Sequence, residues 1–194
     1  YAGSSSFFEL EKVVQQLTGY RHVFPVHQGR AAERILFGVT VVPGMSVPNN
    51  AHFDTTRANV EYLGAEARDF VAPAAADLRS RTPWKGDIDV ARLAAWLEAQ
   101  PKGRVPFGLL TITNNRVGGQ PVSMQNLRAV SELYRRHGLP FFLDAARFAE
   151  NAWWIHRLDP DWQNVPLPLA ARAMFDLADG CMISAKKDGL VNIG

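Results

Sequence analysis

Short, largely apolar runs alternate along the chain with segments whose apolar residues recur at helical spacing, and this alternation is the feature that most constrains the fold. The clearest runs cover residues 107–113, 140–143 and 180–183. Continuous apolar strands, unlike strands with period-two alternation, are typical of a parallel sheet buried on both faces. The chain is therefore predicted to be an α/β protein with a mostly parallel sheet flanked by helices.

Local signals predict where the individual elements begin and end. Serine or aspartate N-caps and glycine C-caps bound several helices. The predicted helices cover residues 7–17, 31–36, 90–97, 127–134 and 169–177. Shorter strands are predicted at residues 22–26, 40–42 and 67–71, a turn at 48–50, and a loop or crossover connection at 52–54.

The charge distribution argues against two classes of partner. The 21 basic and 19 acidic residues are scattered, with a net charge of +2, so neither a nucleic acid nor a membrane surface is expected to bind. No apolar stretch approaches the roughly 20 residues that span a bilayer, and residues 1–9 lack the pattern of a secretory signal. The single cysteine, Cys181, cannot form an internal disulfide, which indicates a reducing compartment and hence the cytoplasm.

The length of 194 residues suits one large domain. The chain begins at Tyr1 without a methionine and stops at Gly194, directly after a segment rich in motifs. We therefore expect one domain of a longer protein.

Polar residues that directly follow apolar strands mark the candidate site, because ligands of parallel sheets bind beyond the carboxyl ends of the strands. Gln28, Gly29 and Arg30 precede a predicted helix, where backbone N–H groups, the helix dipole and an arginine suit a phosphate. An ordinary turn with a solvated Arg30 is the competing interpretation. Asn115 follows the strand at 107–113, where a simple turn former is the alternative.

Two further strand ends carry ionisable groups. Asp144 follows the strand at 140–143, and a buried carboxylate there needs a partner such as a pyridinium nitrogen or Arg147. Lys186 and Lys187 follow Ser184 after the last strand; a partly desolvated lysine there has a nucleophilic neutral amine and can form an imine. A solvated surface loop is the alternative for the lysine pair. The order of all four places along the chain favours one shared site.

Other common sites lack their sequence signals. No G-x-G-x-x-G or P-loop pattern follows a strand, and no nucleophile elbow of a serine hydrolase is present. The histidines show no metal-ligand spacing and no cysteine cluster accompanies them, so zinc is not expected. These five are His22, His27, His52, His137 and His156.

Long motifs of the chain resemble the aromatic amino acid β-eliminating lyases, the family of tryptophanase and tyrosine phenol-lyase. The matching strings are HQGR (27–30), PGMSVPNN (43–50), GGQPVS (118–123), DAARFAENA (144–152) and SAKKD (184–188). They run in order over essentially the whole chain. The resemblance implies the large domain of a fold-type I pyridoxal-phosphate transferase over residues 1–194, truncated at both ends, with an N-terminal arm and the C-terminal small domain absent.

The resemblance also implies roles for individual residues. Lys187 would carry pyridoxal 5′-phosphate as an imine and move the substrate's α-proton. Asp144 would pair with the pyridinium nitrogen, which keeps the ring an electron sink. Phe53 would lie against the pyridine face, although a plain core aromatic is the alternative. The other cofactor-binding residues would be Gln28, Gly29, Arg30 and Ser184 at the phosphate, Asn115 and Arg147 at the ring oxygen, and Lys186.

Parts of the family's site depend on the neighbouring subunit or on absent segments. Tyr1 matches a tyrosine that reaches into the neighbouring subunit's site and assists the leaving group. Asn192 matches one ligand of a potassium site. The arginine that binds the substrate carboxylate would lie in the absent C-terminal part. The resemblance therefore implies a homo-oligomer, a tetramer in the full-length protein, with possible K⁺ binding.

The residue after Phe53 separates the two activities of the family. Asp54 is similar to tryptophanases, whereas tyrosine phenol-lyases carry threonine, and a carboxylate can accept a hydrogen bond from an indole N–H. Segments 178–181 and 190–194 look more like the tyrosine enzyme. We predict cleavage of L-tryptophan to indole, pyruvate and ammonia. The alternatives are tyrosine cleavage to phenol, an aminotransferase or aldolase that shares the core, and a non-catalytic fragment.

Overall fold

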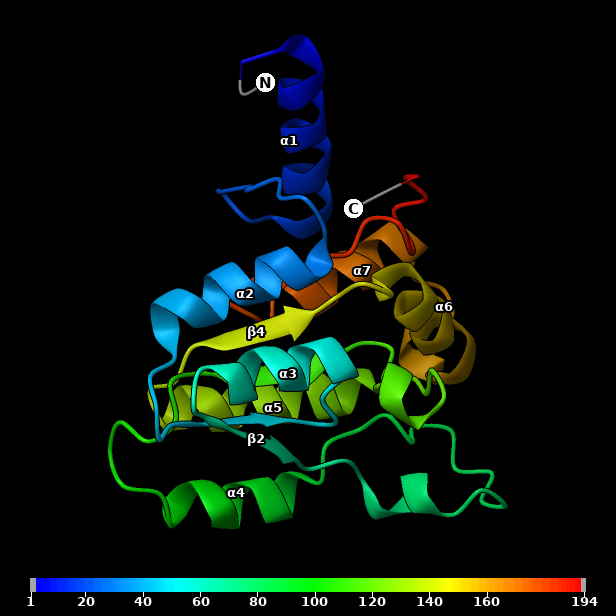
Figure 1. Cartoon of the computed structure of the whole chain (residues 1–194). Helices are drawn as coiled ribbons and strands as arrows, with labels where there is room; N and C mark the ends of the chain where they lie inside the picture. The colour runs from blue at the N-terminus through cyan, green and yellow to red at the C-terminus, as the bar shows by residue number, and fades with distance from the viewer. Residues whose placement is uncertain (1–2, 193–194) are drawn as a thin grey trace.

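A computed structural model describes residues 3–192 of the chain (Figure 1). The strands are β1 (Ser46–Asn49), β2 (Glu66–Asp69), β3 (Gly108–Thr111), β4 (Phe141–Asp144) and β5 (Gly180–Met182). The helices are α1 (Ser5–Thr18), α2 (Gly29–Thr40), α3 (Asp54–Tyr62), α4 (Val90–Glu98), α5 (Met124–Arg136), α6 (Phe148–Leu158) and α7 (Leu167–Phe175). Short 3-10 turns are η1 (Pro73–Ala76), η2 (Asn115–Val117) and η3 (Pro160–Trp162).

The strands pair in parallel, as predicted. β1 pairs with β2, and β3, β4 and β5 pair in that order. Helices separate successive strands, which is the connection that a parallel pair requires. All carboxyl ends within the three-stranded group therefore lie at one edge of the sheet.

Side-chain amides join β1 to β3. The Asn50 amide donates to the Thr111 carbonyl at 2.9 Å, and its oxygen accepts from the Thr111 N–H at 3.1 Å. Asn49 Nδ2 donates to Thr111 Oγ1 at 3.0 Å. Both asparagines are fully buried. The turn predicted at residues 48–50 is thus wrong for residues 48 and 49, which belong to β1, because a distant strand satisfies the polar groups that usually mark a turn.

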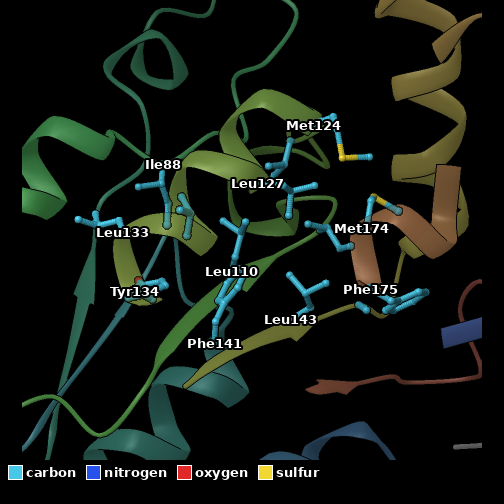
Figure 2. Packing of buried hydrophobic residues seen from close by; sticks show 14 of the residues in the cluster. Ile88, Leu110, Met124, Leu127, Leu133, Tyr134, Phe141, Leu143, Met174 and Phe175 are labelled. Carbon is cyan, nitrogen blue, oxygen red and sulfur yellow. The ribbon is translucent and has the colours of Figure 1, made fainter. Parts of the chain in front are cut away.

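Helices cover both faces of the sheet, which confirms the predicted layers. Leu109 of β3 packs with Phe37 of α2 and Val60 of α3, whereas the next residue, Leu110, belongs to the larger core under α4 to α7. Figure 2 shows Leu110 gathered with Leu127 of α5 in this core. Burial of successive strand residues on opposite faces explains why the strands read as continuous apolar runs.

Several sequence-based predictions are wrong. Residues 22–26 form no strand, since Phe24 is 81% exposed and no strand within the described residues 3–192 pairs with the segment. The strand predicted at residues 40–42 does not form, because α2 continues beyond Gly38 to Thr40 and Val41 is its C-cap. α3 begins at Asp54, where a loop was expected. α6 was not predicted, although Glu150 in its first turn and basic residues in its last turn suit the helix dipole.

α1 extends away from the sheet and its covering helices (Figure 1). The Ser4 hydroxyl caps it by accepting from the Phe7 N–H at 3.3 Å, and Gly19 ends it with a φ of 77°. The Tyr20 hydroxyl donates to the Phe175 carbonyl at 2.9 Å and ties this end of α1 to α7. Across residues 3–192, none of the helices combines the length and apolar character that crossing a membrane demands.

Candidate active site

A cavity of about 210 Å³ opens at the carboxyl edge of the three-stranded group. The last residues of its three strands, Thr111, Asp144 and Met182, all line it. So do all ten residues predicted to bind a cofactor. These are Gln28, Gly29, Arg30, Phe53, Asn115, Asp144, Arg147, Ser184, Lys186 and Lys187. The parallel topology therefore brings together residues that are spread over 160 positions of the sequence.

The N-terminus of α2 forms one wall of the cavity. Gln28 is the N-cap, but its side chain makes no capping hydrogen bond, and the first turn contains no acidic residue. The first N–H groups of a helix lack intrahelical partners and carry partial positive charge. This helix end thus suits an anionic group such as a phosphate, as the sequence predicted.

Gly29 permits a close approach between α2 and the loop after β5. A Cβ atom at this position would lie 2.8 Å from the Cβ of Ser184, which is closer than van der Waals contact allows. The absence of a side chain at residue 29 therefore lets Ser184 line the same cavity wall as the helix N-terminus.

Replacement of Gly29 by alanine is expected to weaken cofactor binding. The new methyl group would push Ser184 and the start of α2 apart, and we expect the Kd for pyridoxal phosphate to rise about tenfold, the effect of losing one good hydrogen bond to a charged group. Absorbance titration of the apoprotein measures this constant. Gly38→Ala is the matched control, because it lies in the same helix and its added Cβ would contact nothing within 4 Å. Equal Kd values for the two variants would contradict this role of Gly29.

Asp144 places a carboxyl group in the cavity with few partners. Burial raises its pKa to about 6; the nearby Glu33 also raises it, whereas the positive charge of Lys187 and a hydrogen bond from the Ala146 N–H lower it. That N–H lies at 3.4 Å. Arg147 pairs with Glu150 at 3.5 Å, and no ion pair joins it to Asp144 in the described part of the chain. The Asp144 carboxyl group is therefore suited to accept from a donor within the cavity.

Lys187 and Phe53 border the same cavity as Asp144. The Lys187 Nζ atom lies 5.6 Å from the centre of the Phe53 ring, within the usual range of a cation–π contact. Phe53 is the N-cap residue of α3, and the Lys187 N–H donates to the Ser184 carbonyl at 3.0 Å. An aromatic face, an amine and a carboxyl group thus line one small space, which is the arrangement that an aldehyde-bearing pyridine ring needs.

The remaining polar groups also fit an anionic, aromatic ligand. Four cationic side chains line the cavity, against two carboxylates. The cations are Arg30, Arg147, Lys186 and Lys187, and the carboxylates are Asp144 and Glu33. Two buried atoms of lining residues, Arg147 Nε and Thr113 Oγ1, have no hydrogen-bond partner among the residues that the structure describes. Because buried polar atoms are normally paired, these two are suited to bind a ligand.

Asp54 and Asn192, which were predicted to act outside the cofactor set, do not line the cavity. Asp54 does not line the cavity; its carboxylate pairs with Arg116 at 2.8 Å, and its side chain is 77% exposed. Asn192 is exposed and also lies away from the cavity lining. Tyr1 lies outside the described residues. Within residues 3–192, no three His, Cys, Asp or Glu side chains gather as a metal site would require.

Glu33 is a site residue that sequence reasoning missed. It is buried, lines the cavity, and accepts hydrogen bonds from Thr56 Oγ1 at 2.5 Å and Asn59 Nδ2 at 3.1 Å. Glu33 follows Gly29 by four positions and so lies on the same face of α2. Helical spacing from the phosphate turn could therefore have identified it, whereas its partners on α3 could not be foreseen.

Comparisons with known proteins show the family of the chain. The sequence model of a family described as β-eliminating lyase matches residues 1–194. Over all 194 residues the chain is 49% identical to a tryptophanase from Rhodobacter capsulatus and 42% identical to a tyrosine phenol-lyase from Fusobacterium nucleatum subsp. nucleatum. It spans 42% of the length of each.

Solved structures support the fold. A chain from a SepCysS–SepCysE N-terminal domain complex matches 96% of this chain, and 44% of its own length is covered, at 16% identity and a TM-score of 0.65. A putative aromatic amino acid β-eliminating lyase/threonine aldolase from Exiguobacterium sp. matches 93% of this chain and 44% of its own, at 18% identity and a TM-score of 0.57. These likenesses confirm the predicted fold-type I architecture.

Proposed function

The chain belongs to the β-eliminating lyase family, and from that premise we propose that the complete protein cleaves L-tryptophan and water to indole, pyruvate and ammonia. The family depends on pyridoxal phosphate in general. The observation that carries the proposal is the single cavity lined by Lys187, Asp144 and the N-terminus of α2. We also propose that residues 1–194 form the large, cofactor-binding domain.

Different residues of the cavity would bind different parts of the cofactor. The start of α2, with Arg30, Ser184 and Lys186, suits the phosphate because it supplies N–H donors and positive charge. Asp144 would accept from the ring N–H, Asn115 and Arg147 would donate to the ring oxygen, and Phe53 would cover one face. When bound, pyridoxal phosphate supplies an electron sink for the electron pair left on the substrate's α-carbon.

Proton transfers are assigned to groups of this chain. The Lys187 Nζ atom would take the α-proton, since it is an amine that already borders the cavity. The Asp54 carboxylate would accept from the indole N–H while the ring is protonated at the carbon that bears the side chain. Tyr1 would assist the departure of the ring in a neighbouring subunit.

The oligomeric state, a bound cation and the cell compartment are also proposed. We propose a homo-oligomer, a tetramer in the complete protein, and a K⁺ ion near Asn192. The single cysteine favours a reducing compartment and hence the cytoplasm. Tyrosine is the second candidate substrate, favoured by the likeness of segments 178–181 and 190–194 to tyrosine phenol-lyase.

Purified complete protein is expected to release indole and pyruvate from tryptophan. Asp54→Asn keeps the side-chain shape but removes the carboxylate, so we expect kcat/KM for tryptophan to fall about 100-fold. Indole colorimetry and a coupled pyruvate assay measure both quantities. S-ethylcysteine is the control substrate: its thiolate departs without ring protonation, so its cleavage is expected to stay within about twofold. Phenol from tyrosine without indole from tryptophan would overturn the proposed substrate.

A further inference from the structure

The function proposed so far gives a role to Asp54 but none to Arg116, the residue with which Asp54 forms an ion pair. Asp54 Oδ1 and Arg116 Nη1 lie 2.8 Å apart and join the first residue of α3 to η2. Phe53 and Thr55, on either side of Asp54, line the cavity, and so does Asn115, next to Arg116. Neither residue of the pair lines the cavity itself, but each is next in sequence to residues that do, so the pair adjoins the proposed cofactor site.

The pair offers one acceptor and one donor to such a side chain. Asp54 can only accept hydrogen bonds when ionised, and Arg116 can only donate them. An indole ring has a single N–H donor and no acceptor, so it satisfies Asp54 alone. A phenol hydroxyl both donates and accepts, so it satisfies both residues at once.

Charge leads to the same distinction between the two rings. Protonation of an indole ring on carbon makes it positive, and the Arg116 guanidinium opposes that charge while Asp54 favours it. A phenol that gives its hydroxyl proton to Asp54 while its ring is protonated stays neutral. Arg116 therefore penalises the reacting indole but not the reacting phenol.

We propose that Arg116 is a specificity-determining residue that extends the substrates of this site from indole to phenol side chains. The inference rests on the proposed lyase function and deepens it: the complete protein cleaves both tryptophan and tyrosine. The pair is exposed, 77% at Asp54 and 53% at Arg116, and exposed ion pairs are weakly held. It can thus open to admit either ring.

Substrate competition in the complete protein tests this role of Arg116. In Arg116→Gln we expect the ratio of kcat/KM for tyrosine to that for tryptophan to fall about tenfold or more, the effect of losing one charged hydrogen bond to the phenol. Arg116→Lys keeps a cationic donor and is expected to restore the ratio to within about threefold of wild type. Arg136→Gln, an exposed arginine at the far end of α5, is the control.

The outcomes separate this inference from the proposed function. A ratio unchanged within about twofold in Arg116→Gln, or wild-type protein that releases indole and no phenol, overturns the role of Arg116 alone. Release of neither indole nor phenol by the wild type overturns the lyase function itself. If Arg116→Gln does not fold, Arg116→Met, with a stem of similar length and no donor, gives the same ratio test. Cleavage of S-ethylcysteine, which has no ring, is expected to stay unchanged in all folded variants.

Discussion

Replacement of Lys187 by alanine is expected to lower tryptophan cleavage by the complete protein about 1000-fold or more, equivalent to roughly 4 kcal/mol of transition-state stabilisation. The substitution removes the one amine that we propose both anchors the cofactor and moves the α-proton. Its position supports this, because the Nζ atom lies 5.6 Å from the Phe53 ring and its charge acts on the Asp144 carboxyl group in the same cavity. Borohydride reduction followed by mass spectrometry reports the covalent link independently of activity.

The neighbouring lysine is the matched variant for this experiment. Lys186 also lines the cavity, so Lys186→Ala is expected to weaken cofactor binding yet keep the borohydride-trapped adduct. Lys102→Ala, on an exposed turn, is expected to behave as wild type. A reduced adduct of unchanged stoichiometry in Lys187→Ala, or its loss only in Lys186→Ala, would show that residue 187 is not the anchor.

Replacement of Asp144 by asparagine is expected to change activity and stability in opposite directions. The variant loses the charge that would hold the cofactor ring protonated, and we expect kcat to fall about 100-fold or more. It also loses a partly buried carboxylate whose pKa is raised to about 6 by desolvation. The apoprotein variant is therefore expected to be more stable than the wild type at pH 8, by up to about 3 kcal/mol.

The sign of the stability effect follows from proton binding. Since the folded-state pKa of Asp144 is raised, the folded protein holds its proton more tightly than the unfolded chain does between about pH 4 and pH 6. The free energy of unfolding of the wild type therefore falls as pH rises through this window, and asparagine abolishes that loss. Asp87, whose pKa burial also raises to about 6, is present in both proteins, so its contribution cancels.

Urea unfolding of both apoproteins at pH 4 and pH 8 measures the difference. We expect the stability advantage of Asp144→Asn to grow between the two values, and added pyridoxal phosphate to reduce it by stabilising the wild type more. A difference that is independent of pH would mean that Asp144 is not held in the buried, proton-retaining state. Full activity of the variant would refute its proposed pairing with the ring nitrogen.

The cavity shows why stability and function conflict at Asp144. Among the described residues, the Arg147 Nε atom and the Thr113 hydroxyl have no hydrogen-bond partner, and the Asp144 carboxyl group accepts one long bond, from the Ala146 N–H at 3.4 Å. Each of these groups lowers the stability of the apoprotein, and a ligand that supplies the missing hydrogen-bond partner would offset that loss. The same unsatisfied groups are therefore a physical sign of the binding site.

Local signals in the sequence determined several elements correctly. Ser4, Asp89 and Ser123 cap α1, α4 and α5 as expected, since an N-cap bonds only to the helix that it begins. The apolar runs predicted β3, β4 and β5 correctly, because a strand that is buried on both faces carries apolar residues at successive positions. Polar residues at the ends of these strands, such as Asp144, line one cavity because the carboxyl ends of parallel strands meet at one edge of a sheet.

Only the tertiary structure decided what depends on a distant partner. The amides of Asn49 and Asn50 bond to Thr111 of β3, the segment at 22–26 finds no strand to pair with, and Glu33 is enclosed by α3. The ion pair of Asp54 with Arg116 joins residues 62 positions apart. A sequence records the hydrogen-bonding capacity and burial preference of each residue. Which groups meet is settled when the chain packs, because a buried polar group bonds to the partner that packing brings to it, even one remote in sequence.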